Sequence, residues 1–198
     1  AEQHPGVAAV YTCDNIGALD LELPQLIPHP CMDSPRTQRP LARGDVYYVG
    51  QTVAMVVAVD RYTAEDAAAL VDVDYDPHPV EIDIEKAILD GAPLVHPTHP
   101  NNIAADLVQI SGDPDSAIAG AEHVTKIRVQ VDRSTAAPME CRAVAATFDK
   151  VMGELTVWDS TQGPIAIRGG LASIFNIDED KVRVIAPHVG GGFGQKVL

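Results

Sequence analysis

The sequence has little that would support a disulfide scaffold, a membrane span or a nucleic-acid interface. Only three of its 198 residues are cysteines, and no two of them form a Cys-x-x-Cys pair. No apolar run approaches the ~20 residues that span a bilayer. Basic residues are scarce, with 14 Lys and Arg against 28 Asp and Glu, so the clustered positive charge that neutralises phosphates is missing. We therefore expect a soluble protein in a reducing, cytoplasmic setting.

Motifs of several common enzyme classes are missing as well. No Gly-x-Ser-x-Gly elbow occurs, which leaves serine hydrolase chemistry without support. His96 and His99 are three residues apart, but no third ligand lies nearby, which speaks against a zinc site. Cys13 and Cys141 have no nearby histidine in a motif that would activate a thiolate, so we interpret them as small core residues.

Four glycines surround one phenylalanine near the end of the sequence, in Val189-Gly-Gly-Gly-Phe-Gly-Gln-Lys196. Glycine costs conformational entropy, so this density indicates unusual backbone dihedrals or a close approach to the main chain. A phosphate-bearing or pterin-like ligand would fit, and so would a tight crossover between packed elements. The segment is not a Walker loop, because Val197 follows the lysine, and it is not a dinucleotide fingerprint, because Gln195 replaces a required glycine.

The hydrophobic pattern of the first half predicts a compact lobe of strands and one helix. A short strand is expected over 6–12, followed by a proline-rich loop over 15–43. The apolar run over 51–59 predicts a strand that is covered on both faces and central in its sheet. Thr63 offers an N-cap for the following helix, and alternation over 71–75 predicts a half-buried strand.

The second half predicts longer strands and a second helix, so the chain as a whole is expected to be of the α+β class. Alternation predicts a strand over 122–131, and a β-hairpin is expected from 143–148 and 154–158. Pro164 is suited to the first position of a helix. A final strand over 182–186 leads into the glycine-rich segment.

Two side chains outside the glycines are candidates for a site. Glu140 is an acid in an apolar stretch, and a buried acid needs a partner or a function. We expect either an ion pair with Arg142 or Arg133, or a place in the wall of a site. Gln162 lies at a strand-to-helix junction, where side chains often face a cleft, although a turn hydrogen bond would also explain it. His188 fits a pocket wall or a surface turn equally well.

Five sequence strings stand in a fixed order along the chain: Arg39-Pro-Leu-Ala-Arg-Gly-Asp-Val-Tyr-Tyr-Val-Gly-Gln-Thr-Val-Ala54, Asp60-Arg-Tyr-Thr-Ala-Glu-Asp-Ala-Ala68, Val73-Asp-Tyr-Asp-Pro77, Trp158-Asp-Ser-Thr-Gln-Gly-Pro164 and Val182-Arg-Val-Ile-Ala-Pro-His-Val-Gly-Gly-Gly-Phe-Gly194. Together they resemble the molybdenum-binding large subunit of the xanthine oxidase and aldehyde oxidase family, and most of all its carbon monoxide dehydrogenase-like branch. The resemblance covers nearly the whole chain.

This resemblance implies a mixed α/β organisation in two domains. An aldehyde oxidase/xanthine dehydrogenase a/b hammerhead domain is expected over 1–105 without its N-terminal strand, then a linker over 106–120, and the start of the molybdopterin-binding domain over 121–198. It also implies a piece of a longer polypeptide, or one half of a split one. In relatives the substrate-pocket loop and the catalytic glutamate base lie further along the sequence. We therefore expect no catalytic residue in this chain, and no activity from it alone.

The resemblance also assigns cofactor-binding residues. Gln162 looks like the family glutamine beside the molybdenum centre, as an apical or neighbouring group and not a firm ligand. Gly191, Gly192, Phe193 and Gly194 look like the loop whose backbone packs against the cofactor. The implied cofactor is molybdopterin with molybdenum, in its cytosine dinucleotide form.

The implied activity is the oxidation of an aldehyde, an N-heteroaromatic compound or carbon monoxide, with oxygen taken from water. Electrons would leave through iron-sulfur clusters to FAD, carried by a small and a medium partner subunit. Val197 stands where the purine-oxidising branch carries glutamate, which speaks against a purine substrate. The alternative is a non-catalytic structural or assembly chain that completes a cofactor site only with a second polypeptide.

Overall fold

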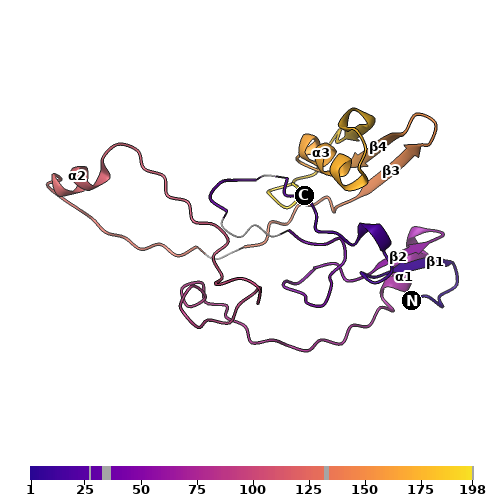
Figure 1. Cartoon of the computed structure of the whole chain (residues 1–198), viewed down its shortest axis with the longest axis horizontal. Coiled ribbons are helices and arrows are strands. Elements are labelled where there is room, and N and C mark those ends of the chain that lie inside the picture. Colours follow the sequence, from indigo (N-terminus) through magenta and orange to yellow (C-terminus); the bar gives the residue numbers. More distant parts are fainter. Residues whose placement is uncertain (27, 33–36, 132–133, 198) are drawn as a thin grey trace.

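The computed structural model describes residues 1–26, 28–32, 37–131 and 134–197, and its strands form two small sheets with a helix against each. The two sheets lie toward the same end of the molecule, while a long excursion of extended chain reaches away from them (Figure 1). The mixture of helices and strands confirms the predicted α+β class.

The first sheet pairs two strands that are distant in the sequence. β1 (Val7–Tyr11) and β2 (Met55–Ala58) are antiparallel, and α1 (Arg61–Ala68) packs against them with Ala67 fully buried. The segment between the strands is irregular apart from the 3-10 turn η1 (Gly17–Leu19), as predicted for the described part of this loop.

Two expectations for this sheet were wrong. The strand predicted over 51–59 forms only as β2, and β1 is its one neighbour, so within the described chain it is not central. An apolar run shows that its residues prefer burial, but it does not show what covers them. Val59 is 76% exposed because no second layer of the described chain covers it. The helix cap is Asp60, whose carboxylate accepts the backbone N–H of Thr63 at 2.8 Å. Thr63 is therefore the third residue of the helix and not its N-cap.

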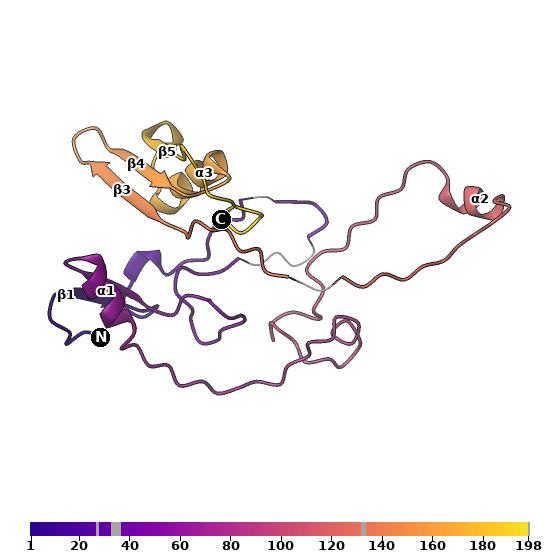
Figure 2. The ribbon, with the colours of Figure 1, turned by 180° about the vertical axis from the view of Figure 1, so that it is seen from behind.

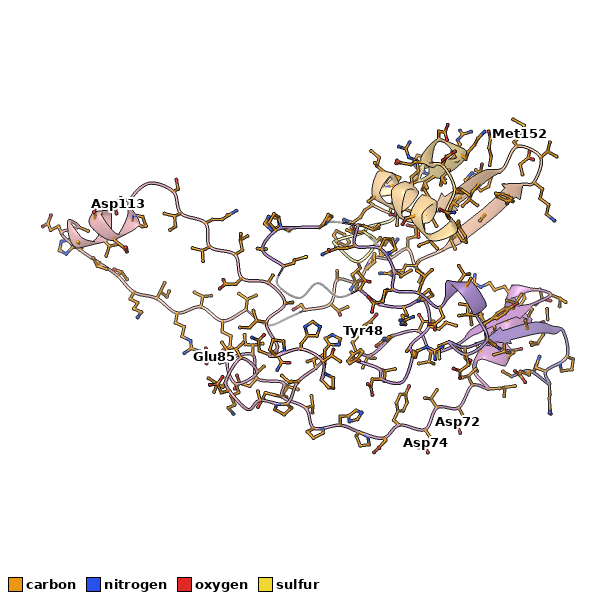
Figure 3. All side chains as sticks on the ribbon, in the orientation of Figure 1. Tyr48, Asp72, Asp74, Glu85, Asp113 and Met152 are labelled. Carbon is orange, nitrogen blue, oxygen red and sulfur yellow. The ribbon has the colours of Figure 1, made fainter. Side chains whose placement is uncertain are left out.

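The strands predicted over 71–75 and 122–131 are also absent from the described structure. Both segments are irregular, and Tyr75 and Ile127 are 60% and 80% exposed. Alternation produces a strand only where a neighbouring edge offers hydrogen bonds, and these segments have none within the described chain. Figure 3 shows the first of them as an extended stretch, with Asp72 and Asp74 directed outward.

The second sheet has the order β3-β4-β5 and confirms the predicted hairpin, helix and final strand. β3 (Val144–Asp149) and β4 (Glu154–Asp159) are antiparallel. α3 (Pro164–Phe175) and the short η2 (Glu179–Lys181) then lead to β5 (Val182–Ile185), which is parallel to β4. Pro164 occupies the first turn of α3, where its missing N–H costs no hydrogen bond.

The hairpin turn is built by one carboxylate. Asp149 accepts the backbone N–H groups of Val151 and Met152 at 2.8 and 3.0 Å, and Gly153 closes the turn with φ +67°. Figure 3 shows Met152 at the tip of this hairpin. The turn holds β3 and β4 in register, with Val144 opposite Asp159 at the other end.

A cluster of buried hydrophobic residues lies between this sheet and α3. It consists of Leu155, Val157, Ala172 and Val182. This cluster fixes the orientation of α3 over β4 and β5, and so fixes the loops that follow both strands.

A short helix that the sequence reasoning missed, α2 (Pro114–Ala119), lies at the tip of the extended excursion, far from both sheets (Figures 1 and 2). Asp113 is its N-cap and accepts the backbone N–H of Ser116 at 3.1 Å. Its Gly-Asp-Pro start indicates a turn as readily as a helix, which is why the pattern did not predict it.

The chain exposes far more surface than a compact protein of its mass. Its accessible area is 15488 Å² for 21.0 kDa, whereas the scaling for compact monomers gives roughly 9,000 Å². Much of the excess lies on the extended segments, where side chains such as Ile82 and Val131 are more than four-fifths exposed. No helix in the described residues is long and apolar enough to cross a membrane.

Candidate functional site

Three segments from different parts of the sequence meet at one edge of the second sheet. The parallel strands β4 and β5 end at the same edge, so residues 160–163 and 186–197 leave the sheet side by side. β3 runs in the opposite direction and therefore starts at this edge, with residues 140–143 just before it. In Figure 1 the C-terminal loop lies close to the chain that enters β3 and to α3.

Gln162 is hydrogen-bonded to the glycine loop, which we define as residues 190–196. The N–H of Gly194 donates to Gln162 Oε1 at 2.9 Å, and the backbone N–H of Gln162 donates to the carbonyl of Lys196 at 2.8 Å. The buried hydroxyl of Thr161 donates to the same carbonyl at 2.9 Å. The strand-to-helix junction and the glycine loop, both singled out in the sequence, therefore form one unit.

Two of the glycines are explained by side chains of this chain. A Cβ on Gly190 would lie 2.6 Å from the Cβ of Glu140. A Cβ on Gly192 would overlap Gln162 Oε1 and would lie 2.9 Å from its Cδ. The close approach predicted at these two positions is therefore made by protein side chains.

The rest of the loop uses unusual dihedrals. Gly191 and Gly194 have φ +95° and +87°, and Phe193 has φ +49° despite its side chain. The Phe193 ring folds against Gly191 and stays 73% exposed. In the described chain nothing lies within 4 Å of where a Cβ on Gly194 would be, so this glycine of the loop keeps one side open. Within the described chain, the N–H groups of Gly192 and Phe193 donate no hydrogen bond.

Glu140 binds the glycine loop, and the predicted pairing with Arg142 was wrong. Its Oε2 accepts both the Lys196 ammonium and the Gly190 N–H, each at 2.8 Å. The hydrogen bond from Lys196, and after it that from Gly190, lowers the pKa of the Glu140 carboxyl below its usual value. Arg142 instead donates to the carbonyl of Gln195, and Arg133 lies outside the described residues. The pair was hidden because 56 residues separate Glu140 from Lys196.

Asp159 is a titratable group at this edge that the sequence did not lead us to expect. Asp159 ends β4, and its burial raises the pKa of its carboxyl, against the lowering effects of the Ser160 N–H and the charges of Arg142 and Lys196. It lines an open hollow of about 400 Å³ together with Thr161 and apolar side chains of β4 and α3. Asp159 stands three residues before Gln162 in the sequence, and this position could have marked it as a site residue.

In the described structure, the histidines considered in the sequence make no hydrogen bond to this unit. His188 is exposed, which fits the surface-turn interpretation. The His96 ring packs 4.5 Å from the ring of Tyr47, and that of His99 lies 5.7 Å from His96. Among the described residues, no three His, Cys, Asp or Glu side chains gather in a way that could hold a metal ion.

Two family descriptions match the sequence. Residues 1–79 match the aldehyde oxidase and xanthine dehydrogenase a/b hammerhead domain, and residues 95–198 match the molybdopterin cofactor-binding domain.

Individual relatives agree with these matches. The chain is 37% identical to the carbon monoxide dehydrogenase large chain of Afipia carboxidovorans, over 100% of this chain and 25% of that protein. It is 36% identical to the nicotine 6-hydroxylase large subunit of Paenarthrobacter nicotinovorans, over 96% of this chain and 21% of that protein. The solved structure of reconstituted CO dehydrogenase from Oligotropha carboxidovorans superposes with a TM-score of 0.79 at 37% identity, over 99% of this chain and 25% of that one. The chain thus spans about a quarter of the length of these relatives.

Proposed function

The chain belongs to the xanthine oxidase and aldehyde oxidase family of molybdenum hydroxylase large subunits, and we propose that its glycine loop and Gln162 hold part of a molybdopterin cofactor. The observation that carries this proposal is the hydrogen bond from Gly194 N–H to Gln162 Oε1. It fixes a polar side chain against a loop whose Gly194 keeps an open side.

The donors at this site suit an oxygen-rich group. In the part of the chain that the structure describes, the Gln162 Nε2 amide donates to no protein acceptor, and neither do the N–H groups of Gly192 and Phe193. Backbone N–H groups in a loop with left-handed residues form concave sites for anions. The absent Cβ at Gly194 lets a large group approach the main chain. These residues therefore fit a cofactor that presents oxygen atoms.

The chain's own contribution is to bind and orient. Gln162 would hold one edge of the cofactor through its amide, as a group beside the molybdenum and not a firm ligand. Gly191, Gly192, Phe193 and Gly194 would support the cofactor through backbone atoms. When bound, the cofactor supplies the redox chemistry, while the protein supplies position and electrostatics. No residue of this chain is proposed as catalytic, and we propose that the chain alone is inactive.

We propose the same domain division that the sequence suggested. A hammerhead domain over 1–105 would precede a linker over 106–120 and the start of the molybdopterin-binding domain over 121–198. The order of the two matched families supports this order of domains, and the molybdopterin-binding match begins at residue 95, before the proposed linker.

The substrate is proposed by class only. Relatives named for carbon monoxide and nicotine support a carbon monoxide, N-heteroaromatic or aldehyde substrate, oxidised with oxygen from water. Val197 argues against a purine. We further propose a cytosine dinucleotide form of the cofactor, an iron-sulfur small subunit, an FAD medium subunit and a cytoplasmic location, which the three free thiols support.

A second candidate function is favoured by the exposed surface. A chain with 15488 Å² of accessible area must cover much of it with other protein, since large exposed apolar patches mark interaction sites. The chain could then be a structural or assembly component that completes a cofactor site only with a second polypeptide.

Metal and pterin analysis of the purified protein, with every polypeptide that accompanies it, tests the proposal. We expect about one molybdenum and one pterin per chain, as for a resident cofactor. A preparation that contains all accompanying polypeptides but neither molybdenum nor pterin would overturn it. Molybdenum present only after a second polypeptide is added back would favour the assembly role.

A further inference from the structure

Glu140 connects the two ends of the glycine loop. One carboxylate oxygen accepts the N–H of Gly190, the first residue of the loop, and the ammonium of Lys196, the last. The backbone N–H of Glu140 also donates to the Gly190 carbonyl at 3.4 Å. The ends of the loop are therefore held together by a residue that precedes β3.

Lys196 also connects the glycine loop to Gln162 through its backbone carbonyl. Its carbonyl accepts the backbone N–H of Gln162 at 2.8 Å and the hydroxyl of Thr161 at 2.9 Å. The ammonium end of Lys196 is thus fixed by Glu140, and its backbone fixes the residue whose side chain binds Gly194. A continuous set of hydrogen bonds runs from Glu140 through Lys196 to Gln162.

Lys196 depends on Glu140 because its side chain is buried. Its side chain is only 1% exposed, whereas that of Glu140 is 38% exposed. A buried ammonium without a counter-charge is strongly disfavoured, so Lys196 keeps its place only while the Glu140 carboxylate is present. The loop cannot shift relative to the start of β3 without separating this pair.

We infer that Glu140 and Lys196 are a positioning pair that sets Gln162 and the glycine loop in the geometry the cofactor requires. This inference rests on the proposed function, because it concerns the same site. Neither residue is proposed to contact the cofactor: both act through Gln162 and the loop. Residues that orient metal-site groups in this way typically alter metal affinity or activity by about 10- to 100-fold when replaced.

Two neutral variants of similar shape test the pair, Glu140→Gln and Lys196→Met, each in the intact enzyme with all accompanying polypeptides. The readouts are molybdenum and pterin content per chain and the Mo(V) electron paramagnetic resonance spectrum. We expect each variant to lose about 10-fold or more of its molybdenum, or to shift the Mo(V) signal of what remains. The double variant should retain at least as much molybdenum as the single variant that retains less, because the effects of replacing two paired residues are not additive.

The matched control is Glu154→Gln, which makes the same chemical change in a surface pair of the same sheet, with Lys181 at 3.6 Å. It should keep full molybdenum content and an unchanged spectrum. If Glu140→Gln does not give folded protein, Glu140→Asp retains the charge on a shorter side chain and should fold with a shifted Mo(V) signal. The inference is wrong if folded Glu140 and Lys196 variants match the control in both readouts. Absence of molybdenum from the unmodified enzyme would instead contradict the proposed function itself.

Discussion

The amide oxygen of Gln162 accepts a hydrogen bond from the backbone N–H of Gly194 at 2.9 Å, across 32 residues of sequence. The two residues follow different strands, β4 and β5, which are parallel and end at the same edge. This contact turns two separate sequence features into one site, and most of what we expect of the protein follows from it.

Replacing Gly192 with alanine should displace Gln162. The new Cβ would overlap Oε1 and lie 2.9 and 3.0 Å from Cδ and Cβ of Gln162, so the side chain has to leave Gly194. We expect molybdenum content to fall by about 10- to 100-fold, measured by metal analysis of the purified enzyme. Gly169→Ala is the control, because that α3 glycine has open space and alanine there should only stabilise the helix, by about 1 kcal/mol. Equal molybdenum in both variants would argue against a role for Gln162.

A substitution at Gly194 should both strain the backbone and block the approach of the cofactor, and a comparison with Gly153 separates these two effects. The Cβ of an alanine at Gly194 or at Gly153 would meet no described residue within 4 Å, and both positions have positive φ. Each variant should therefore lose a similar stability, about 1–2 kcal/mol. Only Gly194→Ala should also lose molybdenum, because Gly153 lies in the distant β3–β4 turn. Loss of molybdenum in both variants, or in neither, would mean that the open side of Gly194 is not used.

The core under α3 should be sensitive to truncation. Leu155 is 9% exposed and packs with Val157 and Val182, so Leu155→Ala should lower the free energy of unfolding by about 2–5 kcal/mol. Val151→Ala, at a 91% exposed position in the hairpin turn, should change it by less than about 0.5 kcal/mol. Chemical denaturation of the purified protein measures both, and similar losses would show that this cluster is not a stabilising core.

Acid should weaken the contact between Asp20 and its arginines. A hydrogen bond from Arg43, and further contacts with Arg43 and Arg39, hold the pKa of Asp20 below its usual value. The ionised form is therefore favoured in the folded protein, and its stabilisation is complete above the unfolded pKa of about 3.9. It is lost as the pH falls through the lower folded pKa.

The thermal midpoint of Asp20→Asn, compared with the unmodified protein, checks this dependence. The variant should be less stable at neutral pH, and the difference should vanish in acid below the folded pKa. Asp72→Asn, at an exposed position in an extended segment, should show no such difference at either pH. A gap that persists unchanged into strong acid would rule out the ion pairs as its cause.

The second sheet could be predicted from the sequence because its signals are local. Asp149 and Gly153 define the turn between two apolar runs, and Pro164 marks the start of α3. Gln162 and the glycines were recognised by their residue types and by resemblance. Gln162 and the glycines meet because β4 and β5 pair in parallel, and no local sequence pattern predicts that pairing.

The failures have a common physical cause. Val59 lies in an apolar run that predicts a buried strand, and Tyr75 and Ile127 lie in alternating runs that predict strands, yet all three residues are more than half exposed. A pattern indicates that a residue prefers burial, but it does not say which polypeptide covers it. The pairing of Glu140 with Lys196 was missed for a related reason, because partner choice across 56 residues depends on topology and not on the neighbouring arginine.

Locating the metal tests the proposed cofactor site most sharply. Crystals of the intact enzyme, measured at the molybdenum absorption edge, would give an anomalous difference map independent of any fitted cofactor. We predict a single strong peak beside the Gln162 amide and the open side of Gly194. A peak remote from both residues would show that Gln162 and the glycine loop do not hold the cofactor, whatever the family to which the chain belongs.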